Sequence, residues 1–203
     1  MDHFFNSEGK IMQALSTLAD LVLLNLITIA CSLPVFTLGA AVTALYDAID
    51  HLQREEGNLF SCYFRTFRAQ FRQATLLWLV LFSALAALLY GLMRLLTGSG
   101  GSFVMVLLFL LAVWSMVLSW AFLLQAQFSR TAFHTLAYAF VCAVRFLPRT
   151  LCMTVLNLLP LAIHLTYPNL AMRFGFLWVL VYFSLAAYCN RKLLPELSGV
   201  IPQ

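Results

Sequence analysis

Long apolar runs, separated by short polar connections, extend over most of the sequence. A helix needs about 20 predominantly apolar residues to cross the ~30 Å hydrocarbon layer of a bilayer. Five stretches approach that length, and we expect each of them to be a transmembrane helix. They are residues 14–33, 74–96, 103–124, 151–167 and 170–189. The pattern therefore predicts an all-α protein, a polytopic bundle of about five transmembrane helices that forms a single membrane domain over residues 1–203.

The apolar and small residues after the first run are too few to cross a bilayer independently. This segment, residues 34–50, opens with Pro34, which lacks a backbone N–H and disfavours helical conformation in the residue before it. We therefore expect a broken first helix or a re-entrant element. Irregular backbone at membrane depth needs protein or a water-filled cavity to satisfy its polar groups, so function is expected here. The candidate functional residues are Asn25, Pro34, Thr37, Gly39, Thr43 and Tyr46.

Two segments, about residues 59–73 and 131–147, have the periodicity of amphipathic helices. The first carries four phenylalanines on one face beside a stripe of arginines, and similar spacing returns in the second. Either the rings enter the lipid while the arginines reach phosphates, or the helices pack on the cytoplasmic face of the bundle with arginine in water. The phenylalanines are Phe60, Phe64, Phe67 and Phe71. The arginines expected at lipid or at the cytoplasmic face are Arg65, Arg68, Arg72, Arg145 and Arg149.

Composition agrees with lipid as the main solvent, because 63% of the residues are hydrophobic and 10% are charged, against about 25% charged in soluble domains. The net charge of +4 does not indicate nucleic-acid binding, because the basic residues lie at the edges of the apolar runs. Nine of the 12 Lys and Arg residues fall in the first connection, the third connection and the tail. Cytoplasmic loops carry such an excess. Five spans then place the N-terminus outside and the C-terminus in the cytoplasm, and an even number would overturn this.

Three polar residues inside the predicted spans are candidates for intramembrane roles, because ionisable and polar groups are costly in lipid. Asp20 either lines a solute path or lies at the outer interface beside Lys10, which we favour. Asn157 can hydrogen-bond across helices or satisfy carbonyls freed by Pro160, so a structural role is favoured. His164 is favoured as a neutral, hydrogen-bonded or interfacial residue.

Motifs of common enzyme families, phosphate-binding loops and metal-ligand spacings are missing from the sequence. We therefore expect no enzymatic activity, no cofactor and no metal site. The five cysteines, which form no CxxC pair, are expected to be reduced packing residues. They are Cys31, Cys62, Cys142, Cys152 and Cys189. The carboxylates of Asp47, Asp50, Glu55 and Glu56 are expected to form solvated salt bridges with nearby arginines in a charged loop, rather than a site for a divalent cation or for acid/base chemistry.

Three blocks of sequence resemble the YesL-like family of bacterial membrane proteins. They are DLVLLN at 20–25, CSLPVFTLGAAVTALY at 31–46 and FRTFRAQFRQAT at 64–75, and the PRTL at 148–151 is similar to a second signature of that family. The resemblance covers nearly the whole chain and departs from the family at Ala69 and Gln70, where a more polar pair is usual. It implies a bacterial cell membrane protein of a family of unknown function, whose genes often lie near those for carbohydrate uptake and polysaccharide degradation. It supplies no catalytic residues.

Two hypotheses of function follow. The first is a non-enzymatic accessory or regulatory component associated with carbohydrate uptake or utilisation, with the lipid bilayer and a carbohydrate transport or sensor protein as partners. The alternative is a small-solute transporter or channel built from two repeats of span, amphipathic helix and span, since such repeats are common in transporters. An intramembrane enzyme would have to rely on Asp20 and His164 and ranks third.

Overall fold

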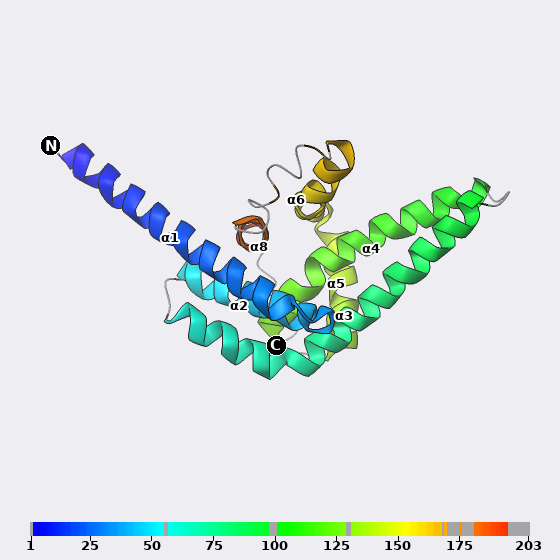
Figure 1. Cartoon of the computed structure of the whole chain (residues 1–203), viewed down its shortest axis with the longest axis horizontal. Helices are drawn as coiled ribbons and strands as arrows, with labels where there is room; N and C mark the ends of the chain where they lie inside the picture. Colours follow the sequence, from blue (N-terminus) through cyan, green and yellow to red (C-terminus); the bar gives the residue numbers. More distant parts are fainter. Residues whose placement is uncertain are drawn as a thin grey trace.

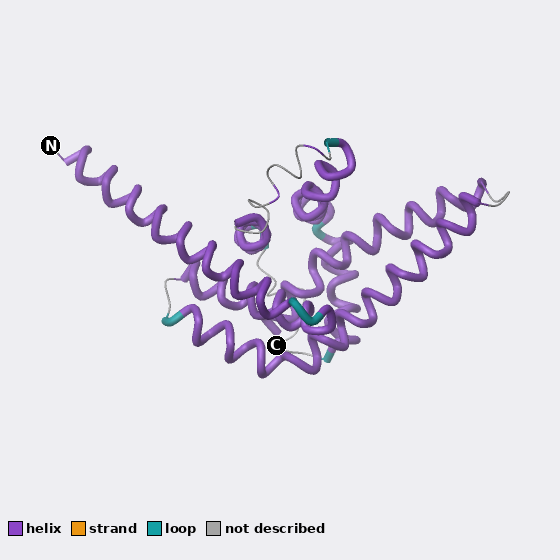
Figure 2. Tube along the Cα trace, viewed as in Figure 1, coloured by secondary structure: helices purple, strands orange, loops and turns teal. Residues whose placement is uncertain are grey.

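The computed structural model describes residues 2–54, 57–97, 101–128, 131–167, 169, 175 and 181–194. These residues form seven α-helices and one short 3-10 helix and contain no strand, as Figure 2 shows. Four of the helices are long and apolar enough to cross a membrane: α1 (Asp2–Ser32), α3 (Leu59–Thr97), α4 (Gly101–Phe128) and α6 (Leu147–Thr166). The predicted all-α bundle of a membrane protein is therefore confirmed.

The break at Pro34 is confirmed, and it turns the chain back on itself. After α1 ends, Pro34 is extended, with φ −75° and ψ 114°, and leads into the 3-10 helix η1 (Val35–Thr37). The Thr37 hydroxyl donates to the carbonyl oxygens of Cys31 and Pro34, both at 2.6 Å, and so satisfies acceptors freed by the break. The next helix, α2 (Leu38–Arg54), then packs back along the second half of α1, as seen in Figure 1.

A second reversal places the start of α3 against α2. Gly57 adopts a positive φ of 69°, where glycine is favoured, and the Asn58 side chain accepts a hydrogen bond from the backbone N–H of Phe60 at 3.1 Å. The first half of α3 returns along α2, and Figure 1 shows that the second half changes direction and runs beside α4. The predicted amphipathic segment and second span are therefore two halves of one continuous helix.

The core lies where α2, the middle of α3 and the second half of α4 meet. Trp120, at the centre of this region, is fully buried, and its indole N–H donates to the Thr150 hydroxyl at 2.9 Å. Gln125 of α4 donates to Gln70 of α3 at 2.9 Å and accepts from Thr135 at 2.6 Å. Such bonds hold helices together where the lipid gives apolar packing little advantage.

The rest of the described chain forms three more helices packed around this core. The second amphipathic segment is α5 (Ala132–Arg145), and only Phe146 separates it from α6. The C-terminal helix α8 (Phe183–Lys192) contacts α1, α2 and α6. Most of the predicted fifth span, at residues 170–174 and 176–180, lies outside the described residues. The number of spans, and the sides of the termini that depend on it, therefore stay predictions.

Candidate functional site

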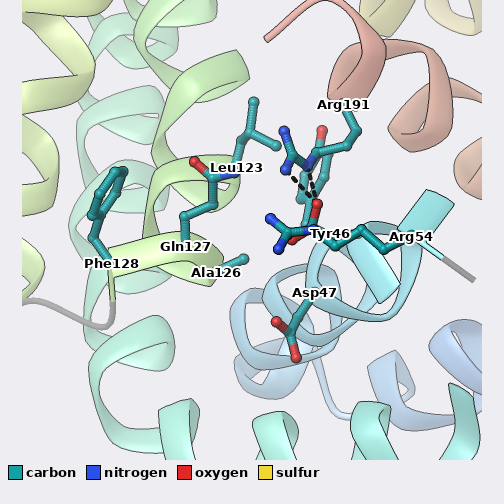
Figure 3. Close-up of a pocket in the computed structure, with 9 residues that line it drawn as sticks. Tyr46, Asp47, Arg54, Leu123, Ala126, Gln127, Phe128 and Arg191 are labelled. Atoms are coloured by element: carbon teal, nitrogen blue, oxygen red, sulfur yellow. Dashed lines mark hydrogen bonds and ion pairs between the residues drawn. The ribbon is translucent and has the colours of Figure 1, made fainter. Parts of the chain in front are cut away.

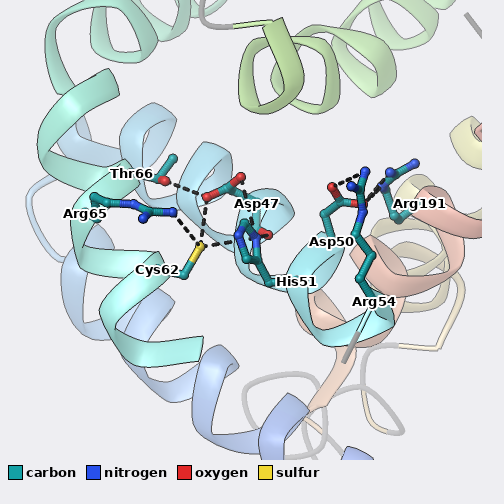
Figure 4. A network of polar contacts seen from close by, with 8 residues as sticks. All are labelled: Asp47, Asp50, His51, Arg54, Cys62, Arg65, Thr66 and Arg191. Carbon is teal, nitrogen blue, oxygen red and sulfur yellow. Dashed lines mark hydrogen bonds and ion pairs between the residues drawn. The ribbon is translucent and has the colours of Figure 1, made fainter. Parts of the chain in front are cut away.

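The C-terminal half of α2 carries a concentrated group of ionisable side chains. Helical spacing places Asp47 one turn before His51 and Asp50 one turn before Arg54. Figure 4 shows that the two pairs face different neighbours: Asp47 and His51 face α3, whereas Asp50 and Arg54 face α8. The last two turns of α2 thus contribute to two adjoining polar clusters, one on the α3 side and one on the α8 side.

The cluster on the α8 side is an ion pair shielded from solvent. Arg191 Nε donates to Asp50 Oδ1 at 2.7 Å, and a second nitrogen of the same guanidinium contacts that oxygen. Arg54 Nη2 lies 3.0 Å from the other carboxylate oxygen. The side chains of Asp50 and Arg191 are 18% and 15% exposed, whereas that of Arg54 is 58% exposed. Because charge-assisted bonds strengthen as water is withdrawn, the Asp50–Arg191 pair is a strong contact between α8 and α2, beside the hydrogen bonds Asn190–Tyr46 and Gln53–Tyr188.

A cavity of about 300 Å³ lies beside this ion pair, between α2, α4 and α8. Figure 3 shows Gln127 and Phe128 of α4 on one side, and Arg54 and Arg191 on the other. Among the described residues, the lining consists of Tyr46, Asp47, Asp50, Arg54, Leu123, Ala126, Gln127, Phe128 and Arg191. It combines guanidinium, carboxylate and amide groups with an aromatic ring, so it can hold a small polar molecule by directional hydrogen bonds and stacking.

Tyr46 is the one buried polar residue among the described residues of this lining. Burial raises the pKa of its hydroxyl, although the hydrogen bond from Asn190 opposes that shift. The phenol is therefore neutral at physiological pH, and its oxygen accepts from Asn190 Nδ2 at 3.1 Å. Tyr46 thus adds a neutral phenol to a lining that also contains the charged groups of Asp50 and Arg191.

The cluster on the α3 side brings three different ligand-type groups together. Cys62 Sγ donates to Asp47 Oδ2 at 3.0 Å and lies 3.3 Å from His51 Nδ1. Thr66 donates to the same carboxylate oxygen at 2.5 Å, and Arg65 Nη2 lies 3.9 Å from the sulfur. One donor atom each from Asp47, His51 and Cys62 lie within 4.8 Å of one another. Carboxylate, imidazole and thiolate are ligand types of protein metal centres.

Most of the functional segment predicted around Pro34 serves packing between α1, α2 and α3. Gly39 is buried where a Cβ atom would lie 2.3 Å from the Ala74 carbonyl oxygen. The Thr43 hydroxyl donates to the Gly39 carbonyl oxygen at 2.8 Å, within α2. Pro34 is exposed, and Thr37 closes the break. Of the residues predicted there, Tyr46 alone lines the cavity.

The polar residues predicted inside the spans have different environments. Asn25 is fully buried, and its side-chain oxygen accepts from the backbone N–H and the hydroxyl of Ser184, at 3.2 and 3.3 Å. Asn157 donates to Ser119 at 3.2 Å and accepts from Asn190 at 2.9 Å. These bonds tie α8 to α1 and to α6.

The two ionisable residues predicted inside the spans lie elsewhere. Asp20 is half-buried on α1, and His164 is exposed in the last turn of α6. Neither of them lines the cavity. The structure therefore does not bring Asp20 and His164 together with the charged end of α2.

All five arginines predicted at lipid or at the cytoplasmic face are exposed: Arg65, Arg68, Arg72, Arg145 and Arg149. Phe60 and Phe64 are exposed beside them on α3, whereas Phe67 and Phe71 are half-buried. The opposite face of this half of α3 is buried against the bundle. The helix therefore combines exposed phenylalanines, as predicted for lipid contact, with packing on the bundle, as predicted by the alternative. On α5 the predicted apolar face is exposed throughout: Phe133, Ala137, Phe140 and Val144.

The expectation that Asp47 and Asp50 lie in a solvated loop is wrong, because α2 continues through them to Arg54. Glu55 and Glu56, predicted in the same loop, lie outside the described residues. The contributions of His51, Cys62 and Arg191 were not foreseen. The i, i+4 spacing of Asp47 and His51 was a usable signal, whereas Cys62 on α3 lies 15 positions from Asp47, and Arg191 on α8 lies 141 positions from Asp50.

The part of the chain that resembles known proteins includes α2 and the first half of α3. No curated protein and no solved structure matches the chain. The family model described as "Protein of unknown function, DUF624" matches residues 21–92. That segment contains the Pro34 break, the whole of α2 and all the residues of the α3-side cluster. Over residues 21–92 the chain is therefore similar to a family of proteins of unknown function, and the α3-side cluster lies within that similarity, whereas Arg191 of the α8-side cluster lies outside it.

Proposed function

We propose that this protein is a non-enzymatic accessory or regulatory membrane component associated with carbohydrate uptake or utilisation. The observation that carries a regulatory role is the cavity of about 300 Å³ beside the Asp50–Arg191 ion pair. An occupant that hydrogen-bonds to either member of the pair changes the contact between α2 and α8. Ligand binding is then coupled to helix position, as a regulatory component requires.

The chemistry of the cavity supports a small hydroxylated ligand. Asp50, Arg54 and Gln127 carry planar groups that donate or accept hydrogen bonds, and Phe128 presents an apolar ring. The volume is at the lower end of the range for small-molecule sites, which suits a ligand of about one sugar ring. The association with carbohydrate comes from the resemblance to the YesL-like family, and the cavity is the feature that fits it.

The alternative is a small-solute transporter or channel, and one observation favours it. Discontinuous helices form the substrate sites of many transporters, and the turn at Pro34 interrupts α1 and α2 in that way. The buried amides of Asn25 and Asn190, however, bond to neighbouring helices. Because these amides join the helices to one another, they favour a fixed bundle rather than a path for a solute.

For orientation, we propose a bacterial cell membrane with the charged end of α2 on the cytoplasmic side. Arg54, Arg65 and Arg191 come from three different helices and gather around this end, as Figure 4 shows. Positive charge on one face of a membrane protein favours the cytoplasmic side. The cavity would then bind a sugar from the cytoplasm.

The test combines crosslinking with sugar uptake in the source bacterium. A photocrosslinking residue at exposed Phe133 should capture a carbohydrate transport or sensor protein, and one at exposed Leu165, at the far end of α6, is the matched control. Deleting the gene should lower the uptake of one sugar several-fold, and wild type should restore it but Asp50→Asn should not. Unchanged uptake and no such crosslinked protein would overturn the proposal. Flux of a sugar or ion through the purified chain in liposomes would favour the transporter.

A further inference from the structure

The α3-side cluster has the composition and spacing of a metal centre. In a tetrahedral zinc site with bonds of about 2.0 to 2.3 Å, neighbouring ligand atoms lie about 3.3 to 3.6 Å apart. Here Cys62 Sγ lies 3.0 Å from Asp47 Oδ2 and 3.3 Å from His51 Nδ1, and that nitrogen lies 3.9 Å from Asp47 Oδ1. The two distances from Cys62 Sγ are therefore within about half an ångström of this spacing, and rotation of the Asp47 carboxylate is needed to bring one of its oxygens to the same spacing from both other atoms.

We propose that Asp47, His51 and Cys62 bind a transition-metal ion of the Zn²⁺ class, with three protein ligands and a fourth position open to water or a small ligand. The proposal does not depend on the function proposed above. It departs from the sequence-based expectation of no metal site, because Cys62 meets the other two residues only when α3 folds against α2.

The surrounding residues hold the ligands in place. Asp47 and His51 lie one turn apart on α2, and Cys62 lies in the first turn of α3, so rigid helices position all three. Thr66 donates to Asp47 Oδ2 at 2.5 Å, which orients the carboxylate as outer hydrogen bonds do in metal sites. The Asp47 and His51 side chains are 18% and 27% exposed, so an ion has access from one side.

The chemistry of binding balances with the loss of one proton. The Cys62 Sγ–H bond breaks, the proton goes to solvent and a metal–sulfur bond forms. His51 Nδ1 lies 3.0 Å from the Asp47 carbonyl oxygen, which can only accept, so this nitrogen carries the proton in the metal-free protein. On binding, that hydrogen bond breaks, the ring takes the tautomer with its proton on Nε2, and Nδ1 coordinates the ion. Arg65 is exposed, so its guanidinium turns into solvent as the ion takes its place near the sulfur.

The ligand set selects the kind of ion. Thiolate and imidazole favour Zn²⁺ and its neighbours in the first transition series, whereas Mg²⁺ and Ca²⁺ prefer all-oxygen sites. Co²⁺ is therefore a suitable probe, because it takes the same tetrahedral ligands and gives a near-ultraviolet charge-transfer band when bound to thiolate.

The experiment uses the full chain, purified in detergent without a polyhistidine tag and freed of metal. Titrating Co²⁺ should produce the thiolate charge-transfer band with one ion per chain, and Zn²⁺ should displace it, whereas Mg²⁺ and Ca²⁺ should not. Cys62→Ser should abolish the band, and His51→Ala should weaken binding at least 10-fold. Thr66→Val should weaken it roughly 10- to 100-fold, as expected for loss of an outer hydrogen bond.

Matched controls come from exposed residues of the same types on other helices. Cys152→Ser on α6 and His134→Ala on α5 should keep the band and the stoichiometry. A wild-type protein without the band, or a Cys62→Ser protein that keeps it, would overturn the proposal. The Co²⁺ titration of wild-type protein does not depend on the folding of any variant. For each variant, a melting curve of the metal-free protein distinguishes the loss of a metal-binding side chain from the loss of folded structure.

Discussion

At the scale of single residues, the contact between α2 and α3 depends on a position without a side chain. A Cβ atom at Gly39 would lie 2.3 Å from the backbone oxygen of Ala74 and 2.7 Å from Trp78 Cβ. Neither obstacle is the flexible end of a side chain, so the helices themselves would have to separate. Glycine at such points lets helix backbones approach closely in membrane proteins.

Gly39→Ala should therefore lower the free energy of unfolding by roughly 1 to 3 kcal/mol, the usual effect of overpacking. Gly91→Ala is the matched control, because its new Cβ would meet Leu107 Cδ1 at 3.4 Å, an ordinary contact. Alanine also favours helix over glycine by roughly 0.5 to 1 kcal/mol, so the control should be neutral or stabilising. Thermal unfolding in detergent measures both variants, and equal melting temperatures would contradict the inferred contact.

A second prediction concerns the side-chain amides of Asn157 and buried Asn190, which link α6 and α8. Asn190 Nδ2 bonds to Asn157 Oδ1 at 2.9 Å and to the Tyr46 hydroxyl at 3.1 Å. In a double-mutant cycle, Asn157→Ala and Asn190→Ala should show a coupling energy of roughly 0.5 to 1.5 kcal/mol, typical of such bonds between membrane helices. Asn157→Ala combined with Gly91→Ala should be additive within error. Coupling near zero in the first pair would show that the amides contribute separately.

The roles of single residues could be predicted from the sequence only where they depend on the backbone next to them and not on tertiary contacts. Pro34 was identifiable because its effect on the backbone does not depend on its surroundings. The importance of Gly39 was predicted, but its reason, the approach of Ala74, comes from tertiary contact. Cys62 was interpreted as a packing residue, because no ligand spacing in the chain reveals that α3 returns along α2.

At the scale of elements, the ion pair beside the cavity is one of the contacts that position α8. The side chains of Asp50 and Arg191 are each less than one fifth exposed, so losing Arg191 leaves a carboxylate with one well-solvated partner, Arg54. Breaking a partly buried pair in this way destabilises more than losing a surface pair, because the remaining charge stays desolvated.

Arg191→Ala should lower the free energy of unfolding by roughly 1 to 3 kcal/mol. Arg54→Ala, which removes the exposed partner of the same carboxylate, should cost less than about 1 kcal/mol. Limited proteolysis at the C-terminal end should also speed up in the first variant and not in the second. If both variants behave alike, the α2–α8 contact does not depend on the shielded pair.

The elements themselves were largely predictable from hydropathy, and the differences lie at their junctions. The pattern changes from amphipathic to uniformly apolar near Ala74, but neither proline nor glycine occurs between Leu59 and Tyr90, so the helix continues. In the second half of the chain, Phe146 separates α5 from α6 at the corresponding place, and Pro148 in the first turn of α6 favours the start of a new helix there. Hydropathy is similar at the two junctions, but one lies within a continuous helix and the other lies between two helices. The duplication of the two halves therefore stays a prediction.

At the scale of the whole molecule, Figure 1 shows the first half of α1 and the paired ends of α3 and α4 extending away from the core. Large apolar side chains cover these extensions and are exposed, among them Leu15, Tyr90, Met93 and Phe109. From Ala74 to Thr97, α3 is roughly 36 Å long at 1.5 Å per residue, enough to cross the ~30 Å hydrocarbon layer. Lipid contact with these helices follows from their composition and exposure.

The direction in which α3 crosses the membrane can be tested without knowing the total number of spans. Asn58 precedes α3 and Thr97 ends it, and both are exposed. The charge distribution predicts Asn58 in the cytoplasm, near Arg54 and Arg65, and Thr97 outside. A membrane-impermeant maleimide should therefore label Thr97→Cys in intact spheroplasts, and Asn58→Cys only after permeabilisation, with wild type giving the background from native cysteines. The opposite pattern would invert the proposed orientation and place the cavity of α2 outside the cell. It would also remove the reason to connect that cavity with a cytoplasmic sugar.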